Sequence, residues 1–323
     1  MTAPSTEWKE KVAPGEEQRL AAFATAIAGM QRTMSDRFGR GRAFHRKPIA
    51  ALRATLEVAP DLPEHARQGL FATPGRYDVR IRLSNGSVRP QKNSEPDIRG
   101  FALSIHGVSG ESALGGPATT QDFLLINREV FGFTDVGPFV DLAIAASKGP
   151  LAIVALFIRT YGFFRGLSEV RRLLGSIRSP FSGFLTETFF SGVPVAWGPY
   201  AARLRLLPAG PPRATPAPDP RDEVFARLAA GPSTHALQVQ FYVDERVTPI
   251  EDGAANWAEV DAPYLTVGTV TIPGQGADDA LVAEVEAFGF DPWHALAAHR
   301  PLGHTMRARK AAYFASQQGR AEP

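Results

Sequence analysis

The sequence contains no cysteine among its 323 residues. That absence excludes disulfide bonds, a thiolate nucleophile and any metal centre held by thiolates. An excess of charge of one sign is also missing, because 35 basic residues stand against 33 acidic ones and the formal net charge is +2. Such a balanced chain does not favour nucleic acid as a partner, and we expect none.

Long hydrophobic runs are scarce as well. The most apolar stretch, LAIVALFIRTYGFF at residues 151–164, is too short to span a bilayer and contains Arg159. We expect a buried helix there, with shallow membrane contact or an entrance for a fatty substrate as the alternative. The first twenty residues mix both charge signs and lack the apolar core of a signal peptide, which predicts a cytoplasmic protein.

Apolar and aromatic side chains are plentiful, at 44% and 10% of the residues, which is enough to bury a large core. YDVRIRLS at residues 77–84 alternates polar and apolar residues with the period of a strand, and FALSIHG and DFLLIN are short apolar runs bounded by turn residues. HALQVQFYVDE and YLTVGTVTI repeat the strand pattern later in the chain. We therefore predict an antiparallel sheet.

Helical patterns separate these strands and follow them. Residues 139–177 have helical periodicity, as do DDALVAEVEAF and the last twenty residues. Residues 206–222, LLPAGPPRATPAPDPRD, hold too many prolines for a helix or a central strand and predict a surface connection. Strands on both sides of a helical insertion favour one sheet closed from distant segments. We therefore predict a single α+β domain over residues 1–323, with residues 1–40 as an N-terminal helical arm.

The stretch RARKAAYFASQQGR near the end places three polar side chains at helical spacing. Arg309, Tyr313 and Arg320 stand at i, i+4 and i+11, so in a helix all three project from one face. On spacing alone, the pattern fits a tyrosine packed under two solvated arginines. Other segments are needed to give it a function.

Two earlier segments carry further candidates. Arg42 and His45 lie three residues apart before a strand-like run, so a guanidinium and an imidazole could point into one cavity. Arg80, Arg82 and Ser84 alternate along one face of the first predicted strand. Arginines turned into an interior need anionic partners, because an unpaired buried guanidinium is very costly. The simpler interpretation leaves Arg80 and Arg82 in solvent.

Taken together, these motifs resemble a known family. Arg-x-x-His, Arg-Leu-Ser at residues 82–84, an Arg-Gly-Phe-Ala strand, the Phe-rich TTQDFLLINREVFGF and, far downstream, Arg-x-x-x-Tyr occur here in the order found in the haem catalases. The ending HRPLGHTMRARKAAYFASQQGR looks like that of the short catalase-related peroxidase branch. The resemblance covers about residues 42–320. It implies a catalase-like antiparallel β-barrel that encloses haem b, with helices packed around it.

The resemblance assigns the proximal side of the haem to the last helix. Tyr313 matches the tyrosine whose phenolate oxygen is the axial ligand of the iron, and Arg309 matches the arginine that keeps that phenol ionised. A phenol is ionised at neutral pH only when positive charge is close, and the iron and a guanidinium both supply it. Arg42, Arg82 and Arg320 match the residues that bind the haem propionates, for which the planar guanidinium fork is suited.

On the distal side, His45 matches the general base that moves a proton between the two peroxide oxygens, and Ser84 matches the serine that orients it. Phe131 matches the aromatic residue that packs over the haem, eight residues after Phe123 in what we expect to be one strand. Thr119 stands where the family has an asparagine that positions hydrogen peroxide. Because a hydroxyl is shorter and rotates freely, handling of the second peroxide that a catalase needs should be poorer.

The resemblance therefore implies a haem peroxidase. It would reduce H2O2 or organic hydroperoxides through an oxoferryl intermediate, with a small-molecule reductant as the external electron donor. The alternatives are a weak catalase, a fatty-acid hydroperoxide isomerase of the allene oxide synthase type, and a non-catalytic haem-binding or sensing protein. The oligomeric state stays open, a homo-oligomer included. His294, His299 and His304 do not share one helical face and predict no metal site of their own.

Overall fold

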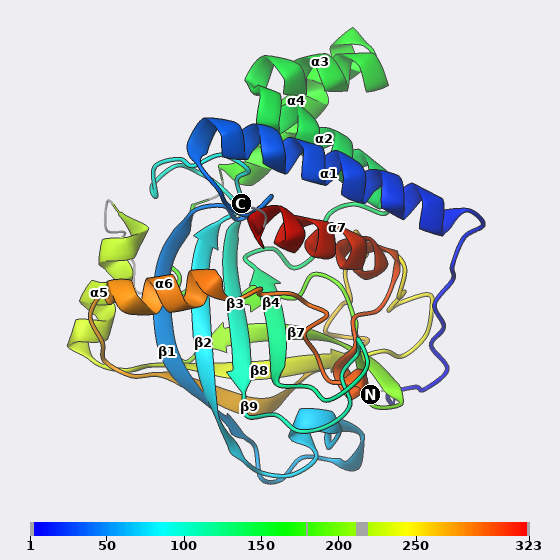
Figure 1. Cartoon of the computed structure of the whole chain (residues 1–323). Helices are drawn as coiled ribbons and strands as arrows, with labels where there is room; N and C mark the ends of the chain where they lie inside the picture. The colour runs from blue at the N-terminus through cyan, green and yellow to red at the C-terminus, as the bar shows by residue number, and fades with distance from the viewer. Residues whose placement is uncertain (1–2, 179, 211–218, 322–323) are drawn as a thin grey trace.

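The computed structural model describes residues 3–178, 180–210 and 219–321, and its centre is a β-barrel (Figure 1). Within these residues, nine strands form one antiparallel sheet. The strands are β1 (Pro48–Val58), β2 (Arg76–Asn85), β3 (Arg99–His106), β4 (Thr120–Ile126), β5 (Phe189–Phe190), β6 (Val195–Trp197), β7 (Tyr200–Pro208), β8 (Ser233–Phe241) and β9 (Tyr264–Ile272).

The sheet closes on itself through the short strand β5. The strand order is β5-β4-β3-β2-β1-β9-β8-β7-β6, and β5 also pairs with β7. Phe190 of β5 lies opposite Ile126 of β4, and Phe189 lies opposite Leu206 of β7. Leu56 of β1 pairs with Val270 of β9, so early and late segments share one ladder. The prediction of an α+β fold with one sheet closed from distant segments is confirmed.

Alternation along β2 sorts its side chains between the barrel core and the outer face. Ile81 and Leu83 are fully buried in the central apolar cluster, where each contributes roughly 1.5–3 kcal/mol of burial free energy. Since successive side chains of a strand point to opposite faces, Arg80, Arg82 and Ser84 point outward. The outer face of β2 therefore carries the polar residues that the sequence singled out.

Helices cover the outside of the barrel (Figure 1). Within the described residues the α-helices are α1 (Glu16–Phe38), α2 (Val136–Lys148), α3 (Pro150–Tyr161), α4 (Phe163–Ile177), α5 (Pro220–Ala230), α6 (Asp279–Ala287) and α7 (His304–Ala321). Helices α1, α2 and α7 pack against one another at one end of the barrel, and α6 lies across β1 and β2. Helices α3 and α4 project away from the barrel beyond α2. This arrangement brings α6 and the far end of α7 over the polar face of β2.

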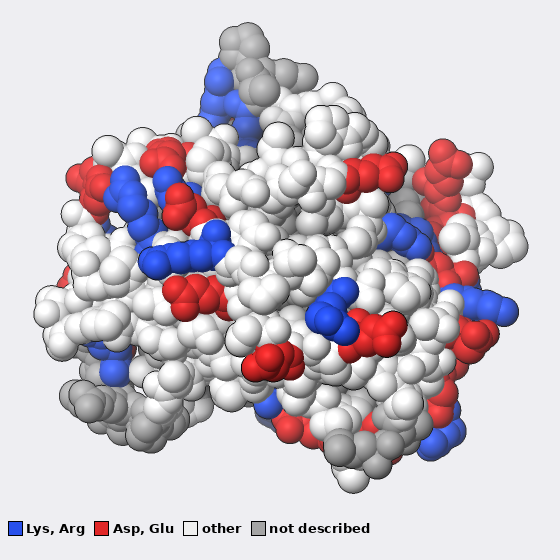
Figure 2. Space-filling view, turned by 90° about the horizontal axis from the view of Figure 1, so that it is seen from below, with Lys and Arg blue, Asp and Glu red and all other residues white. Residues whose placement is uncertain are grey.

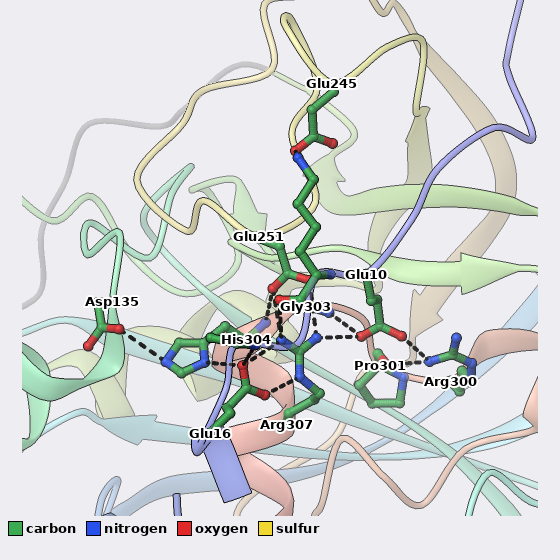
Figure 3. A network of polar contacts seen from close by, with 12 residues as sticks. Glu10, Glu16, Asp135, Glu245, Glu251, Arg300, Pro301, Gly303, His304 and Arg307 are labelled. Carbon is green, nitrogen blue, oxygen red and sulfur yellow. Dashed lines mark hydrogen bonds and ion pairs between the residues drawn. The ribbon is translucent and has the colours of Figure 1, made fainter. Parts of the chain in front are cut away.

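A network of carboxylates fixes the start of α7 (Figure 3). The Arg307 guanidinium donates to Glu10 at 2.9 Å, to Glu16 at 2.6 Å and to Glu251 at 3.1 Å. Burial works against the charge, but the hydrogen bonds that Arg307 donates to Glu16 and Glu251 outweigh it and raise the pKa of Arg307 above its ordinary value. Glu10 and Glu16 come from the N-terminal segment, so that segment ties α7 to α1.

The helical stretch predicted at residues 139–177 is present, divided into three helices. Gly149, with φ 122°, separates α2 from α3, and Gly162, with φ 80°, separates α3 from α4. Glycine adopts such positive φ values without steric cost, which explains both breaks. The prediction of a buried helix at residues 151–164 is wrong, because α3 has no buried residue where it projects from the barrel. Among the described helices, none has the length and apolar character needed to cross a bilayer.

Two further parts of the predicted organisation differ in detail. The N-terminal arm is helical only from Glu16, and the residues before it are not helix. The proline-rich connection is shorter than residues 206–222, because β7 continues to Pro208 and α5 begins at Pro220. A proline suits the first turn of a helix, where its missing N–H would have no partner. Residues 211–218 of that connection lie outside the described residues.

Candidate functional site

The last helix presents Arg309 and Tyr313 side by side, as their i, i+4 spacing predicts. Nη2 of Arg309 donates a hydrogen bond to the Tyr313 phenol oxygen at 2.9 Å. The guanidinium carbon also lies 5.2 Å from the centre of the Tyr313 ring. The phenol oxygen therefore accepts a hydrogen bond from a guanidinium one turn earlier on the same helix.

His45 lies just before β1, beside the end of β2. Its Nδ1 atom is 3.0 Å from the Ser84 hydroxyl oxygen, and its carbonyl accepts a hydrogen bond from Arg82 Nη2 at 2.8 Å. Its φ of 50° falls in the left-handed region that residues other than glycine rarely adopt. The two contacts from β2 thus hold His45 in a backbone conformation that it would not adopt by itself.

Gly100 of β3 provides the space for this imidazole. A Cβ atom at Gly100 would lie 2.6 Å from Nδ1 of His45 and 2.8 Å from the hydroxyl oxygen of Ser84. Both distances are well below van der Waals contact. The glycine is needed because the His45 ring and the β3 backbone approach each other so closely.

The surroundings of His45 keep its imidazole neutral. Burial among protein atoms, followed by the positive charges of Arg82, Arg309 and Arg42, lowers the pKa of His45 to about 3. A neutral imidazole can accept a proton at pH 7. Because Arg309 belongs to α7, the charges that act on His45 come from both β2 and the last helix.

Three arginines from different parts of the chain converge next to this pair. Arg42 precedes β1, Arg82 belongs to β2 and Arg320 to α7; we call them the arginine triad. Glu286 of α6 lies among them. Its carboxylate is 2.5 Å from Arg82 Nε and 3.9 Å from Arg42 Nε, and its carbonyl accepts from Arg320 Nη1 at 3.5 Å. The side-chain carboxylate of Glu286 therefore pairs with Arg82 and Arg42, while Arg320 reaches only its backbone carbonyl.

One carboxylate does not satisfy this triad. Within the described residues, the Nε atoms of Arg42 and Arg320 are buried without a hydrogen-bond partner. Burial, with added repulsion from Arg82 and Arg320, lowers the pKa of Arg42 to about 9. Burial also lowers the pKa of Arg320. Buried guanidiniums with free donors and excess positive charge form a binding site for anions.

A cavity of about 540 Å³ opens beside the triad. Its walls include Arg42, Arg320 and Glu286, together with Gln317, which lies one turn after Tyr313 on α7. Its size is that of a cofactor or small-molecule site. The lining residues do not include Tyr313, so the cavity marks the triad's side of the site.

Two of the predicted site residues lie farther out. Phe131 follows β4, which ends at Ile126, so it does not belong to the same strand as Phe123. Its ring lies 5.0 Å from that of Phe139, which in turn lies 5.3 Å from Phe44, the neighbour of His45. Phe131 is therefore part of an aromatic wall that reaches the site.

Thr119 is not brought to His45. It is exposed and stands just before β4, at the end of the strand where Thr120 pairs with His106. Gly100, which lies against His45, pairs with Ile126 at the other end of β4. The length of a strand separates Thr119 from the imidazole.

Sequence reasoning missed Glu286, although the charge pattern held a signal. Arg80 and Arg82 are two residues apart, and so are Glu284 and Glu286. The structure pairs them in order, with Arg80 Nε 2.8 Å from Glu284 and Arg82 Nε 2.5 Å from Glu286. The interpretation that left both arginines in solvent is wrong for Arg82, whose exposed fraction is 3%.

Comparisons with known proteins agree on the architecture. No protein-family model and no curated protein sequence matches the chain. Among solved structures, a bacterial catalase superposes with a TM-score of 0.67 at 16% identity, over 99% of this chain and 63% of that protein. A fungal catalase gives 0.67 at 17% identity, over 87% and 59%. Catalase A from Saccharomyces cerevisiae gives 0.62 at 14%, over 90% and 62%. The chain spans about three-fifths of the length of each, and it has the catalase fold.

Proposed function

We propose that this protein is a haem-dependent peroxidase that reduces hydrogen peroxide or organic hydroperoxides with electrons from a small external donor. The observation that carries the proposal is the charge balance of the triad, in which three arginines surround Glu286 and its single carboxylate pairs with Arg82 and Arg42. Two positive charges remain, and haem b brings two propionates. The catalases that share the fold support peroxide as the substrate.

The residues of the site fit haem b on chemical grounds. Arg42, Arg82 and Arg320 would hold the propionates, since guanidiniums bind carboxylates through charge-assisted hydrogen bonds. The phenol oxygen of Tyr313 would hold the iron. Arg309 would stabilise the phenolate through the hydrogen bond that it already donates.

When bound, haem supplies the iron that takes up the peroxide and passes on the electrons. His45 is the proton carrier of the site, because its neutral imidazole can take a proton from one peroxide oxygen and return it to the oxygen that leaves. Ser84 fixes the ring by its contact with Nδ1, which leaves Nε2 for the peroxide. The net reaction consumes two electrons and two protons and turns ROOH into ROH and water.

The aromatic wall of Phe131, Phe139 and Phe44 favours organic hydroperoxides as substrates, because its rings offer apolar surface near His45. Thr119 has no part in this proposal, since it lies at the far end of β4. The asparagine-like role expected for it would need a residue closer to the imidazole.

Haem reconstitution tests the proposal. Purified wild type, Tyr313→Phe and the matched control Tyr200→Phe would each be titrated with haem and followed by absorption spectroscopy. Wild type and Tyr200→Phe should give the same high-spin ferric spectrum, and Tyr313→Phe should lose or alter it. A wild type that takes up no haem, or a Tyr313→Phe spectrum equal to that of wild type, contradicts the proposal.

Assays of the reconstituted protein separate the candidate activities. A peroxidase oxidises a donor dye with H2O2 or cumene hydroperoxide faster than it releases oxygen. Oxygen release that exceeds donor oxidation indicates a catalase, and rearrangement of a fatty-acid hydroperoxide without any donor indicates an isomerase. A stable haem complex without turnover indicates a haem-binding or sensing protein. His45→Gln should slow the peroxide step and leave haem uptake unchanged.

A further inference from the structure

The hairpin formed by α3 and α4 is rich in apolar residues and is only partly covered by the fold. It projects from the helical end of the molecule, away from the barrel (Figure 1). Helix α3 has the sequence PLAIVALFIRTY and no buried residue. A surface helix of a globular protein normally buries one apolar stripe, whereas α3, which packs against α2 and α4, leaves all of its side chains at least partly exposed.

Exposed apolar side chains are concentrated on this hairpin. Ten large apolar residues are exposed in the described part of the chain, and five of them lie here: Leu151, Tyr161, Phe163, Phe164 and Leu174. Phe164 is 87% exposed and Leu151 is 84% exposed. A contiguous apolar region of this kind marks an interaction surface.

The charge of the hairpin is positive. Residues 149–178 contain five arginines and one acidic residue, Glu169, whereas the whole chain has a net charge of only +2. The rest of the chain is therefore slightly acidic. The face at the opposite, lower end of the molecule shows red and blue side chains interspersed (Figure 2). Positive charge and exposed aromatic rings occur together on the hairpin.

We propose that the α3–α4 hairpin docks this protein on the surface of an anionic lipid bilayer. Aromatic and leucine side chains enter the boundary between headgroups and acyl chains, while arginines contact the lipid phosphates. This proposal goes beyond the peroxidase function and does not depend on it.

The charge argues against a second copy of the chain as the partner. Two hairpins packed face to face would bring ten arginines together with two glutamates, and such like-charge contact is unfavourable. A lipid surface has the opposite sign. It can also surround a convex hairpin, whereas a protein would have to offer a deep groove to cover an element that projects from the fold.

The geometry indicates that the hairpin lies on the bilayer. Twelve residues make α3 about 18 Å long, shorter than the hydrocarbon core. Phe163 and Phe164 stand at the tip, immediately after the break at Gly162. Gly166 lets α4 approach α3 closely, since a Cβ there would lie 2.8 Å from the Ile158 backbone. The two helices therefore form one compact element with its aromatic residues at the end.

Vesicle sedimentation tests the proposal with the purified full chain. We would use vesicles of phosphatidylcholine alone and of equal parts phosphatidylcholine and phosphatidylglycerol. Wild type should bind the anionic vesicles at least tenfold more tightly than the neutral ones. Arg171→Gln/Arg172→Gln should weaken anionic binding by about thirtyfold, at about fivefold per arginine. Phe163→Ser/Phe164→Ser should weaken it by at least tenfold.

Matched controls use residues outside the hairpin. Val260→Ser removes an apolar side chain that is 88% exposed, and Arg76→Gln removes an exposed arginine. Both should bind like wild type. Equal affinity of wild type for both vesicle types, or equal losses in hairpin and control variants, overturns the proposal. So does sedimentation equilibrium that shows a dimer which Phe163→Ser/Phe164→Ser dissociates, because a second copy would then cover the hairpin.

Discussion

Two clusters of charge fix the two ends of α7, and their compositions are opposite. At the start of the helix, Arg307 is surrounded by three glutamates and its pKa is raised. Toward the end, Arg320 belongs to a triad of arginines with one glutamate, and burial and mutual repulsion lower the pKa of Arg42 to about 9. Both clusters draw on residues distant in sequence. The first cluster satisfies its arginine, and the second leaves its arginines in need of an anion.

This difference separates a structural role from a binding role. A guanidinium whose donors all meet carboxylates contributes to stability and has nothing left for a ligand. Buried guanidiniums with unused Nε donors reduce stability until an anion arrives. The number of carboxylates around each buried arginine therefore distinguishes a cluster that stabilises the fold from one that is suited to bind an anion.

Removing Arg307 should have the largest effect on stability. Arg307→Ala leaves Glu10, Glu16 and Glu251 crowded without their cation, and we expect a loss of about 3–5 kcal/mol in the free energy of unfolding. Urea denaturation measures it. The matched control, Arg53→Ala, breaks an exposed pair with Asp278 and should leave the free energy of unfolding nearly unchanged, because solvent screens such a pair. Similar losses of stability in both variants would show that the cluster around Arg307 does not stabilise the fold.

Removing Glu286 should have a smaller effect that depends on haem. Glu286→Gln takes the only side-chain carboxylate from the triad, so without haem we expect a loss of about 1–3 kcal/mol. Added haem should reduce this loss of stability relative to wild type, because the propionates then neutralise the arginines. The control is Glu284→Gln, because Glu284 pairs with the partly exposed Arg80 and not with the triad. Haem should change the stability of this variant as it changes that of wild type. If the difference in free energy of unfolding between Glu286→Gln and wild type stays the same after haem is added, the triad is not the cluster that binds an anion.

A mildly acidic pH should reduce the stability of the fold less than either substitution does. The pKa of His45 is lowered to about 3, against an unfolded value of about 6.5. Between these values the unfolded chain binds a proton that the folded chain does not, so stability falls as pH drops below 6.5. His45 accounts for about 1 kcal/mol of that loss at pH 6. His235 and His299, both with lowered pKa values of about 4, act in the same direction.

Denaturation midpoints of wild type and His45→Gln, measured from pH 8 to pH 5, isolate the share of His45. The variant should lose less stability than wild type over this range. Identical pH slopes would mean that His45 titrates alike in both states, so that burial and the charges of Arg82, Arg309 and Arg42 do not lower its pKa.

Local patterns in the sequence predicted local structure well. The alternation in β2 gave the strand and its two faces, and the spacing of Arg309 and Tyr313 gave the hydrogen bond of 2.9 Å between them. These succeed because period-two and i, i+4 relations depend on a single element. The prediction of a buried helix at residues 151–164 was wrong because composition shows how apolar a helix is but not which other elements cover it.

Relations between elements were harder to predict. Glu286 enters the site from α6, and its two-residue spacing from Glu284, which matches that of Arg80 and Arg82, does not by itself say which strand the helix covers. Thr119 was placed by its position before a strand, but the antiparallel register of β3 and β4 carries it away from His45. In both cases the outcome depends on how strands and helices are laid against one another. The role of each residue as a haem or peroxide contact stays a prediction.

The close approach of Gly100 to His45 has a consequence for assembly. In an antiparallel sheet, a slip of one residue turns every side chain to the other face. If β3 slipped by one position, Phe101 or Arg99 would replace Gly100 beneath the imidazole, and His45 would have no room. The His45 site can therefore form only when β3 has its correct register, because a slipped strand leaves no space for the imidazole.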